Sequence, residues 1–303
     1  MRAFTILSEI LNKTTMKNII LILIFFLSTE FLHSQKRLLS WSQSNIENYT
    51  KEMYDEAQKL SINQLLEKNK NVQYWSEVFL ILNASLNNHS KNNEYIKLLT
   101  EQITDKIETK LKGTSRLIIW ERISNGDIIF EGKGIIFEND LFTVSGRANE
   151  LLQGLTGKNF GYVYLNSTDE DLKLLKRKWE DFLNGKSIEE YNLVDTTNAK
   201  IPEITSLFAV EALIHSLQEN MYKDSLTRNC LKNVYKLDEM PNDKSSSAIY
   251  CNPDTYTFGY LAMLFGDEKT DEAKNAKWWL EYWKSNKTKL KWNSVKGIFE
   301  INN

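Results

Sequence analysis

The sequence predicts a mainly α-helical protein, built either as a helical bundle or as an irregular array of helical repeats. Two observations predict this fold class. The chain has only 3 prolines and 12 glycines among its 303 residues, so residues that break helices are rare. Apolar side chains also recur at steps of three and four residues over long stretches, which is the spacing of an amphipathic helix.

Three helices are expected in the first third of the chain, over Ser44–Leu66, Val72–Leu86 and Glu94–Leu111. Short polar segments separate them, and Gly113 follows the third. The apolar positions that define their faces are Ile46, Tyr49, Met53, Ala57 and Leu60 in the first, Trp75, Phe79 and Leu82 in the second, and Ile96, Leu99, Ile103 and Ile107 in the third. Consecutive helices with short connections are typical of a bundle or a repeat array.

The stretch from Thr114 to Asp140 has two interpretations. Leu117–Ile123 and Ile128–Phe130 would form a hairpin around Asn125-Gly126, a pair that suits a type I′ turn. Alternatively, Thr114 or Ser115 would cap a helix that Gly126 ends in a left-handed conformation. Because helices are predicted on both sides of this stretch, we favour the helix over the hairpin. A small β-ribbon near residues 128–144 stays open, and a short helix is expected to begin at Ser145-Gly146.

A motif occurs twice. Phe160-Gly161-Tyr162 precedes a helix that ends near Leu183, and Phe258-Gly259-Tyr260 precedes one that ends near Trp283. We expect a tight turn at each glycine, and acidic residues, Asp169-Glu170 and Asp271-Glu272, near each helix start. The large aromatic residues that fall on one side of these helices are Trp179 and Phe182 in the first copy, and Trp278, Trp279, Tyr282 and Trp283 in the second.

We expect these aromatic rings to be buried, with a structural role, because large aromatic side chains dominate protein cores. The alternative is an exposed aromatic platform for glycans or peptides. Trp292, which lies beyond the second helix, is expected to fold back on the same cluster as a closing lid.

The repeated segments resemble one that recurs in exported bacterial HEAT-like helical-repeat proteins. The resemblance rests on Thr156-Gly157-Lys158-Asn159 before Phe160-Gly161-Tyr162, and on a Trp-rich helix that ends in Asn-Lys. It covers Leu155–Lys186 and Thr257–Lys289. The copies lie about a hundred residues apart instead of in tandem, and their helices align only with a gap. The resemblance implies a helical scaffold used for binding and carries over no activity.

A linker is expected between Gly185 and Pro202, because this segment has no sustained hydrophobic period. It divides the chain into an N-terminal helical region, 35–194, and a C-terminal helical region, 195–303. In the C-terminal region we expect helices over Pro202–Asn220 and Leu226–Leu237. Proline suits the first turn of a helix, which is where Pro202 lies in the first of the two. The segment Pro241–Pro253 is expected to be a loop.

The first residues predict export. Met16-Lys17-Asn18 precedes an apolar run, Ile19–Leu27, and the segment ends in Leu32-His33-Ser34-Gln35. A basic start, a short apolar run and a small residue before a polar one are typical of a secretion signal, whereas a spanning helix needs roughly 20 apolar residues. We expect residues 1–34 to be a signal peptide, with translation from Met16, and the remaining chain to be secreted or periplasmic without a stable transmembrane segment.

Composition and net charge disfavour several classes of function. The formal net charge is −2 and Lys/Arg runs are missing, which disfavours nucleic-acid binding. Cys230 and Cys251 are the chain's two cysteines, and export predicts that they form one disulfide. Outside the predicted signal peptide, His89 and His215 are the remaining histidines and lie far apart, so neither a metal site nor a cofactor is predicted.

The sequence favours a binding protein over an enzyme. No GxSxG, HExxH or P-loop motif is present. We expect the partner to be a protein or a cell-envelope component. The alternative is a carbohydrate-active hydrolase or lyase that uses two carboxylates roughly 5 to 10 Å apart. Acids beside aromatic or apolar neighbours are Glu121, Asp127, Glu131 and Glu211. A groove with facing carboxylates would favour the enzyme, and an apolar groove would favour binding.

Overall fold

The computed structural model describes residues 50–111, 117–132, 134–191, 206–243, 245–266 and 274–302. Within these ranges the fold is mainly helical, which confirms the predicted class, and the strands form two sheets of two strands each. None of the described helices has the length and apolar character needed to cross a membrane. The predicted signal peptide, the boundary at residue 195 and Asp271-Glu272 lie outside the described residues.

Four helices open the described chain: α2 Lys51–Ala57, α3 Ile62–Asn71, α4 Trp75–Asn88 and α5 Asn93–Gln102. The prediction of a single helix over Ser44–Leu66 is wrong. Ser61 starts a new helix, because its hydroxyl accepts a hydrogen bond from the Gln64 backbone while the Gln64 side chain accepts from the Ser61 backbone. In this reciprocal cap each residue accepts a hydrogen bond from the backbone N–H of the other, so these amides are satisfied without the preceding helical turn that a continuous helix would require.

The third predicted helix, α5, ends well before Leu111. The backbone N–H of Thr109 donates to the carbonyl of Phe142 at 2.7 Å, and Glu108 pairs with Thr143 in an antiparallel bridge. These contacts hold the chain after α5 in an extended conformation beside the start of α7. The apolar spacing alone did not reveal that a distant segment would satisfy this backbone.

The region after residue 116 matches neither interpretation completely. Strand β1, Leu117–Ile118, pairs in parallel with β2, Ile135–Ile136, and the short helix α6 covers Trp120–Ser124. The hairpin is therefore wrong. The helix exists but starts later than expected, and Gly126 adopts the left-handed conformation with φ 87°. Of the small β-ribbon near residues 128–144, β2 is present, but it pairs with β1 and not with another segment of that range.

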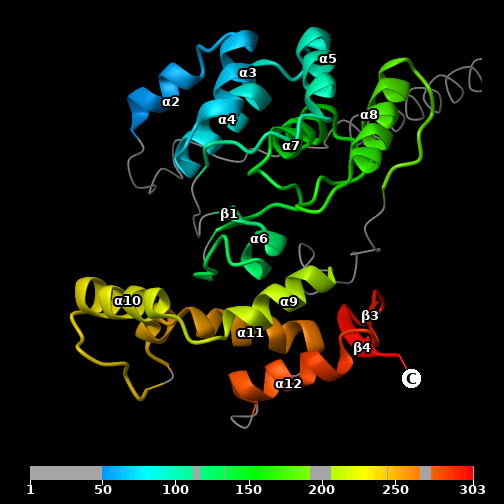
Figure 1. The fold of residues 1–303 in the computed structure, drawn as a ribbon. Helices are drawn as coiled ribbons and strands as arrows, with labels where there is room; N and C mark the ends of the chain where they lie inside the picture. The colour runs from blue at the N-terminus through cyan, green and yellow to red at the C-terminus, as the bar shows by residue number, and fades with distance from the viewer. Residues whose placement is uncertain are drawn as a thin grey trace, which may run out of the picture.

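Helices α7, Val144–Thr156, and α8, Asp169–Leu183, follow, and α5 packs against both. The chain then continues through α9 Leu207–Ser216, α10 Met221–Cys230 with a π-helical turn η2 Leu231–Tyr235, the 3₁₀ helix η3 Ser247–Cys251, α11 Pro253–Phe265 and α12 Ala276–Asn286. It closes with an antiparallel pair that the sequence did not predict, β3 Leu290–Asn293 and β4 Ile298–Ile301. Figure 1 shows α2–α5, α7 and α8 in an upper group, α9–α12 in a lower group, and α6 between them.

The repeated motif does not repeat in structure. Gly161 has φ 135° in an extended segment, as a glycine in a tight connection requires. Phe258, Gly259 and Tyr260 instead lie inside α11, where Gly259 has no positive φ. The expected turn in the second copy is therefore wrong. Asn252 and Pro253 start α11 five residues before Phe258, and the helix continues until Gly266.

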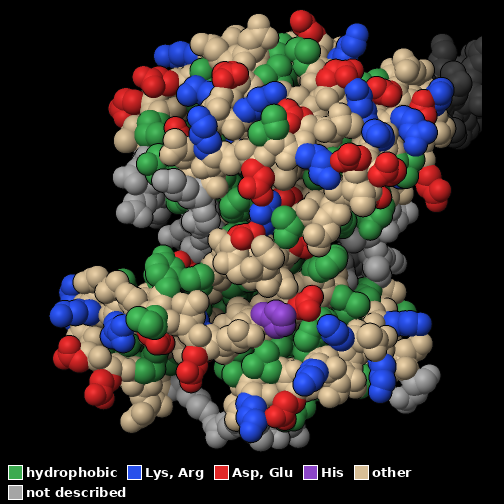
Figure 2. All heavy atoms as spheres, viewed as in Figure 1, with side chains coloured by type: hydrophobic (Ala, Val, Ile, Leu, Met, Phe, Trp, Pro, Cys, Tyr) green, Lys and Arg blue, Asp and Glu red, His purple; other side chains and the backbone are tan. Residues whose placement is uncertain are grey.

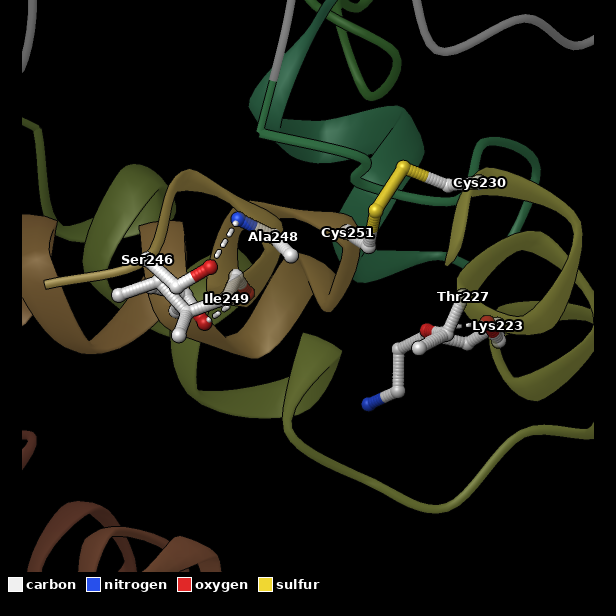
Figure 3. Close-up of a disulfide and its surroundings, with 8 residues drawn as sticks. Lys223, Thr227, Cys230, Ser246, Ala248, Ile249 and Cys251 are labelled. Atoms are coloured by element: carbon white, nitrogen blue, oxygen red, sulfur yellow. Dashed lines mark hydrogen bonds between the residues drawn. A yellow bond between two sulfur atoms is a disulfide. The ribbon is translucent and has the colours of Figure 1, made fainter. Parts of the chain in front are cut away.

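The predicted disulfide is present, since Cys230 and Cys251 are bonded. Figure 3 shows the bond, which joins the end of α10 to η3. Cys251 also belongs to a small hydrophobic cluster with Leu231 and Ala248. The main hydrophobic core includes residues from both sides of position 195, because α9 packs against α6, α11 and α12. The two predicted regions thus share buried contacts.

Candidate functional site

A buried layer of amide side chains fixes the extended segment from Phe160 to Tyr164 against α7. Asn149 and Gln153 both donate to the carbonyl of Gly161, at 2.9 and 2.8 Å. The side-chain oxygen of Asn139 accepts from the backbone N–H of Val163 at 3.0 Å. A segment outside helices and sheets needs such partners, because buried backbone groups without hydrogen bonds are costly. The layer therefore sets the positions of Tyr162 and Tyr164.

Four aromatic rings then form a continuous row, which we call the aromatic strip: Tyr191, Tyr162, Tyr164 and Phe208. Successive ring centroids lie 5.6, 6.2 and 6.1 Å apart. The strip lines a cleft of about 350 Å³. Tyr191 and Phe208, at its two ends, are 42% and 43% exposed, so a ligand can reach the rings. The polar and charged side chains of the lining are Glu121, Asn166, Ser167, Asp171 and Lys178.

Glu121 on α6 is the buried acid of this cleft. It is 8% exposed, and its Oε2 accepts from the backbone N–H of Leu165 at 2.7 Å. Among the described residues its other oxygen has no hydrogen-bond partner. Burial raises the pKa of Glu121, the hydrogen bond from Leu165 opposes that shift, and the charge of Asp140 adds to it.

A second acid, Glu138, directly precedes Asn139 of the amide layer. It forms no hydrogen bond or ion pair within the described part of the chain. Burial raises its pKa to about 7, and the charges of Glu121 and Glu150 contribute. Burial raises the pKa of Tyr162 to about 12, and the charge of Glu138 adds to that rise. The charge of Glu138 therefore acts on Tyr162, although Glu138 is not among the residues that line the cleft.

The neighbouring Arg122 lowers the pKa of Glu121 by its charge, but its ion pairs within the described residues are with other acids. Arg122 directs Nε and Nη2 to the two oxygens of Asp140, at 3.0 and 2.8 Å. Its Nη1 donates to Asp127 at 3.0 Å, and Nη2 also reaches Glu108 at 3.2 Å. A guanidinium engaged in this way pins α6 to the loop before α7. Glu121 and Arg122 are adjacent in sequence, but Glu121 lines the cleft whereas Arg122 holds α6 to the loop before α7.

Of the four acids named from the sequence, Glu121 lines the cleft. Asp127 is paired with Arg122, and Glu211 accepts from the indole N–H of Trp283 at 3.3 Å. Glu131 is not among the residues of the lining. Glu138 was missed, as was the strip itself. The alternation of Tyr162 and Tyr164 is the one local signal that points to the strip, since alternate residues of an extended segment share a face.

The structural aromatic residues differ in exposure. Trp179, Trp279 and Trp283 are 0%, 4% and 6% exposed, whereas Phe182, Trp278 and Tyr282 are half-buried. Trp278 and Tyr282 stack with centroids 5.0 Å apart. Trp292 lies in β3 and packs on Phe299 at 5.1 Å, so the closing element is a hairpin.

The described residues contain no group of His, Cys, Asp and Glu side chains able to hold a metal ion. The visible face in Figure 2 shows acidic and basic side chains interspersed, without a continuous basic patch. Neither a protein-family model nor a curated protein nor a solved structure matches this chain. The similarity to HEAT-like proteins therefore stays a prediction from the two segments.

Proposed function

We propose that the protein is exported and binds a cell-envelope glycan in the cleft lined by the aromatic strip, without catalysing a reaction. The observation that carries this proposal is the row of four touching rings beside the buried acid Glu121. Binding sites of this type combine an apolar, aromatic lining with a few placed polar groups.

A sugar ring has the complementary chemistry. Its C–H groups give it an apolar face that can lie on an aromatic ring, while its hydroxyl groups point outward from the ring edge. The strip offers successive rings to successive sugar residues, and Glu121, Asn166 and Ser167 offer hydrogen-bond partners at their edges. A folded protein partner would be expected to prefer a broad patch to a cleft of about 350 Å³.

Export is supported by two independent features. The predicted signal peptide precedes the described residues, and the Cys230–Cys251 disulfide suits an oxidising compartment such as the periplasm or the cell exterior. Cell-envelope glycans are accessible to a protein located there.

A carbohydrate-active hydrolase is the second candidate, and the acid pair favours it. Glu121 is a buried acid in the cleft, and Glu138 has a pKa of about 7, near the value at which a general acid works at neutral pH. In this role one carboxyl group would stay protonated while the other is ionised, as in glycosidases. The binding role needs only the strip, whereas the hydrolase also needs Glu138 to reach the ligand.

The test is calorimetric titration of the purified protein with oligosaccharides of cell-envelope type. Replacing Tyr164 or Phe208 by alanine should weaken binding by about tenfold, which corresponds to about 1.4 kcal/mol. Tyr222→Ala is the matched control, because Tyr222 is 54% exposed on α10 and is not part of the cleft. Equal affinities for the Tyr164→Ala and Tyr222→Ala variants would refute the proposal. Release of shorter sugars during the titration, lost in Glu121→Gln, would establish the hydrolase instead.

A further inference from the structure

We infer that the cleft selects glycans whose amino sugars carry a free ammonium group, in preference to neutral or acidic sugars. This inference rests on the proposed glycan-binding function and specifies the class of ligand. It is carried by the position of Glu121, by the aromatic faces of the strip and by the distribution of charge around them.

The first observation is the incomplete pairing of Glu121. More than nine tenths of this residue is buried, it lines the cleft, and one of its two carboxylate oxygens has no partner among the described residues. This oxygen is not fully buried, so a donor bound in the cleft can reach it. An ammonium group would supply both a hydrogen-bond donor and the compensating positive charge, which makes the stronger, charge-assisted bond.

The second observation is the strip itself. The face of an aromatic ring carries partial negative charge and attracts cations, and this attraction grows when the cation is removed from water. Tyr162, Tyr164, Tyr191 and Phe208 all belong to the lining of the same cleft as Glu121. A cationic sugar can therefore contact ring faces and a carboxylate within one site, whereas a neutral sugar gains only from stacking and ordinary hydrogen bonds.

The third observation is the balance of charge. Glu121 and Asp171 line the cleft, and the charges of Glu138 and Glu150 act on Tyr162. The basic member of the lining is Lys178, whose Nζ donates to the carbonyl of Phe160 at 3.2 Å. Acidic groups outnumber basic ones around the strip even when Arg122, whose charge also acts on Glu121, is counted, so the local potential favours a cation. A uronic acid would instead bring a carboxylate toward Glu121 and be repelled.

The experiment compares oligomers of glucosamine, which carry ammonium groups, with N-acetylglucosamine oligomers of the same length, which are neutral. Both are titrated calorimetrically into the full protein near neutral pH. The glucosamine oligomer should bind about tenfold more tightly, and its affinity should fall as salt is added, because ions screen the attraction. The salt series uses the unaltered protein and is therefore independent of the folding of any variant.

Glu121→Gln should remove the preference for the ammonium form, since the amide keeps the size of the side chain and an oxygen for the Leu165 N–H. Glu219→Gln is the matched control, because Glu219 is an exposed acid that does not line this cleft. Equal or tighter binding of the neutral oligomer would overturn the inference and leave glycan binding intact. Retention of the preference in Glu121→Gln would also overturn it. Failure of both oligomers to bind would instead refute the proposed function.

Discussion

Replacing Trp179 by alanine tests the packing on which the cleft depends. The indole is fully buried, and its ring lies 4.7 Å from Phe160 and 6.1 Å from Phe182, measured between centroids. Truncation of a buried tryptophan to alanine costs about 3 to 5 kcal/mol of unfolding free energy. The Nε1–H also donates to Asn149 Oδ1 at 2.9 Å, so the variant leaves a buried acceptor unpaired, which costs about 1 to 3 kcal/mol. We therefore expect a loss at the upper end of the 3 to 5 kcal/mol range.

The assay is urea denaturation followed by far-ultraviolet circular dichroism, with the free energy obtained by linear extrapolation. Trp278→Ala is the matched control, because Trp278 is half-buried on α12 and should cost clearly less. Trp179→Phe separates the two contributions, since it keeps an aromatic ring but removes the N–H donor. A loss below about 1 kcal/mol for Trp179→Ala, or one equal to that of Trp278→Ala, would refute the assignment of this ring to the core.

Two further predictions concern the disulfide and the pH dependence of stability. Reduction of the Cys230–Cys251 bond, which joins residues 21 positions apart, should cost about 3 kcal/mol of unfolding free energy and lower the melting temperature by several degrees. The control is the variant with both cysteines replaced by serine, whose melting temperature should not change when reductant is added. An unchanged melting temperature of the unaltered protein on reduction would contradict the prediction. The pKa of Glu138 rises from an ordinary 4.5 to about 7 on folding. Between these two pH values the folded state binds more protons than the unfolded state, so stability should decrease as pH rises through this window. The expected loss is about 1 to 3 kcal/mol after allowance for solvent screening. Glu138→Gln should flatten this dependence in urea denaturation across the window, and a slope that persists would show that another group is responsible.

The comparison of sequence and structure shows where local reasoning holds. Helix α8 follows its hydrophobic period closely, because Leu172, Leu175 and Trp179 face the core and Thr168 caps the start with Asp171. Helix α5 does not, because its apolar spacing continues to Ile107 although that residue is 65% exposed. There the backbone pairs with the segment before α7, and a contact so distant in sequence overrides the local pattern.

The repeated Phe-Gly-Tyr motif illustrates the same limit. In the first copy the buried amides of α7 take up the carbonyl of Gly161 and hold the segment extended. In the second copy the cap at Asn252 starts α11, and the same three residues continue this helix. Identical short sequences therefore adopt different conformations because their tertiary surroundings provide different hydrogen-bond partners.

The sequence by itself determined the helical class, the pairing of the two cysteines and the apolar face of α8, because each depends on composition or on residues a few positions apart. Only the tertiary structure decided the cleft. Its walls come from α6, from α8 and the segments on either side of it, and from α9. They meet because α9 packs against α6, and this long-range contact brings Phe208 into line with the tyrosines beside Glu121.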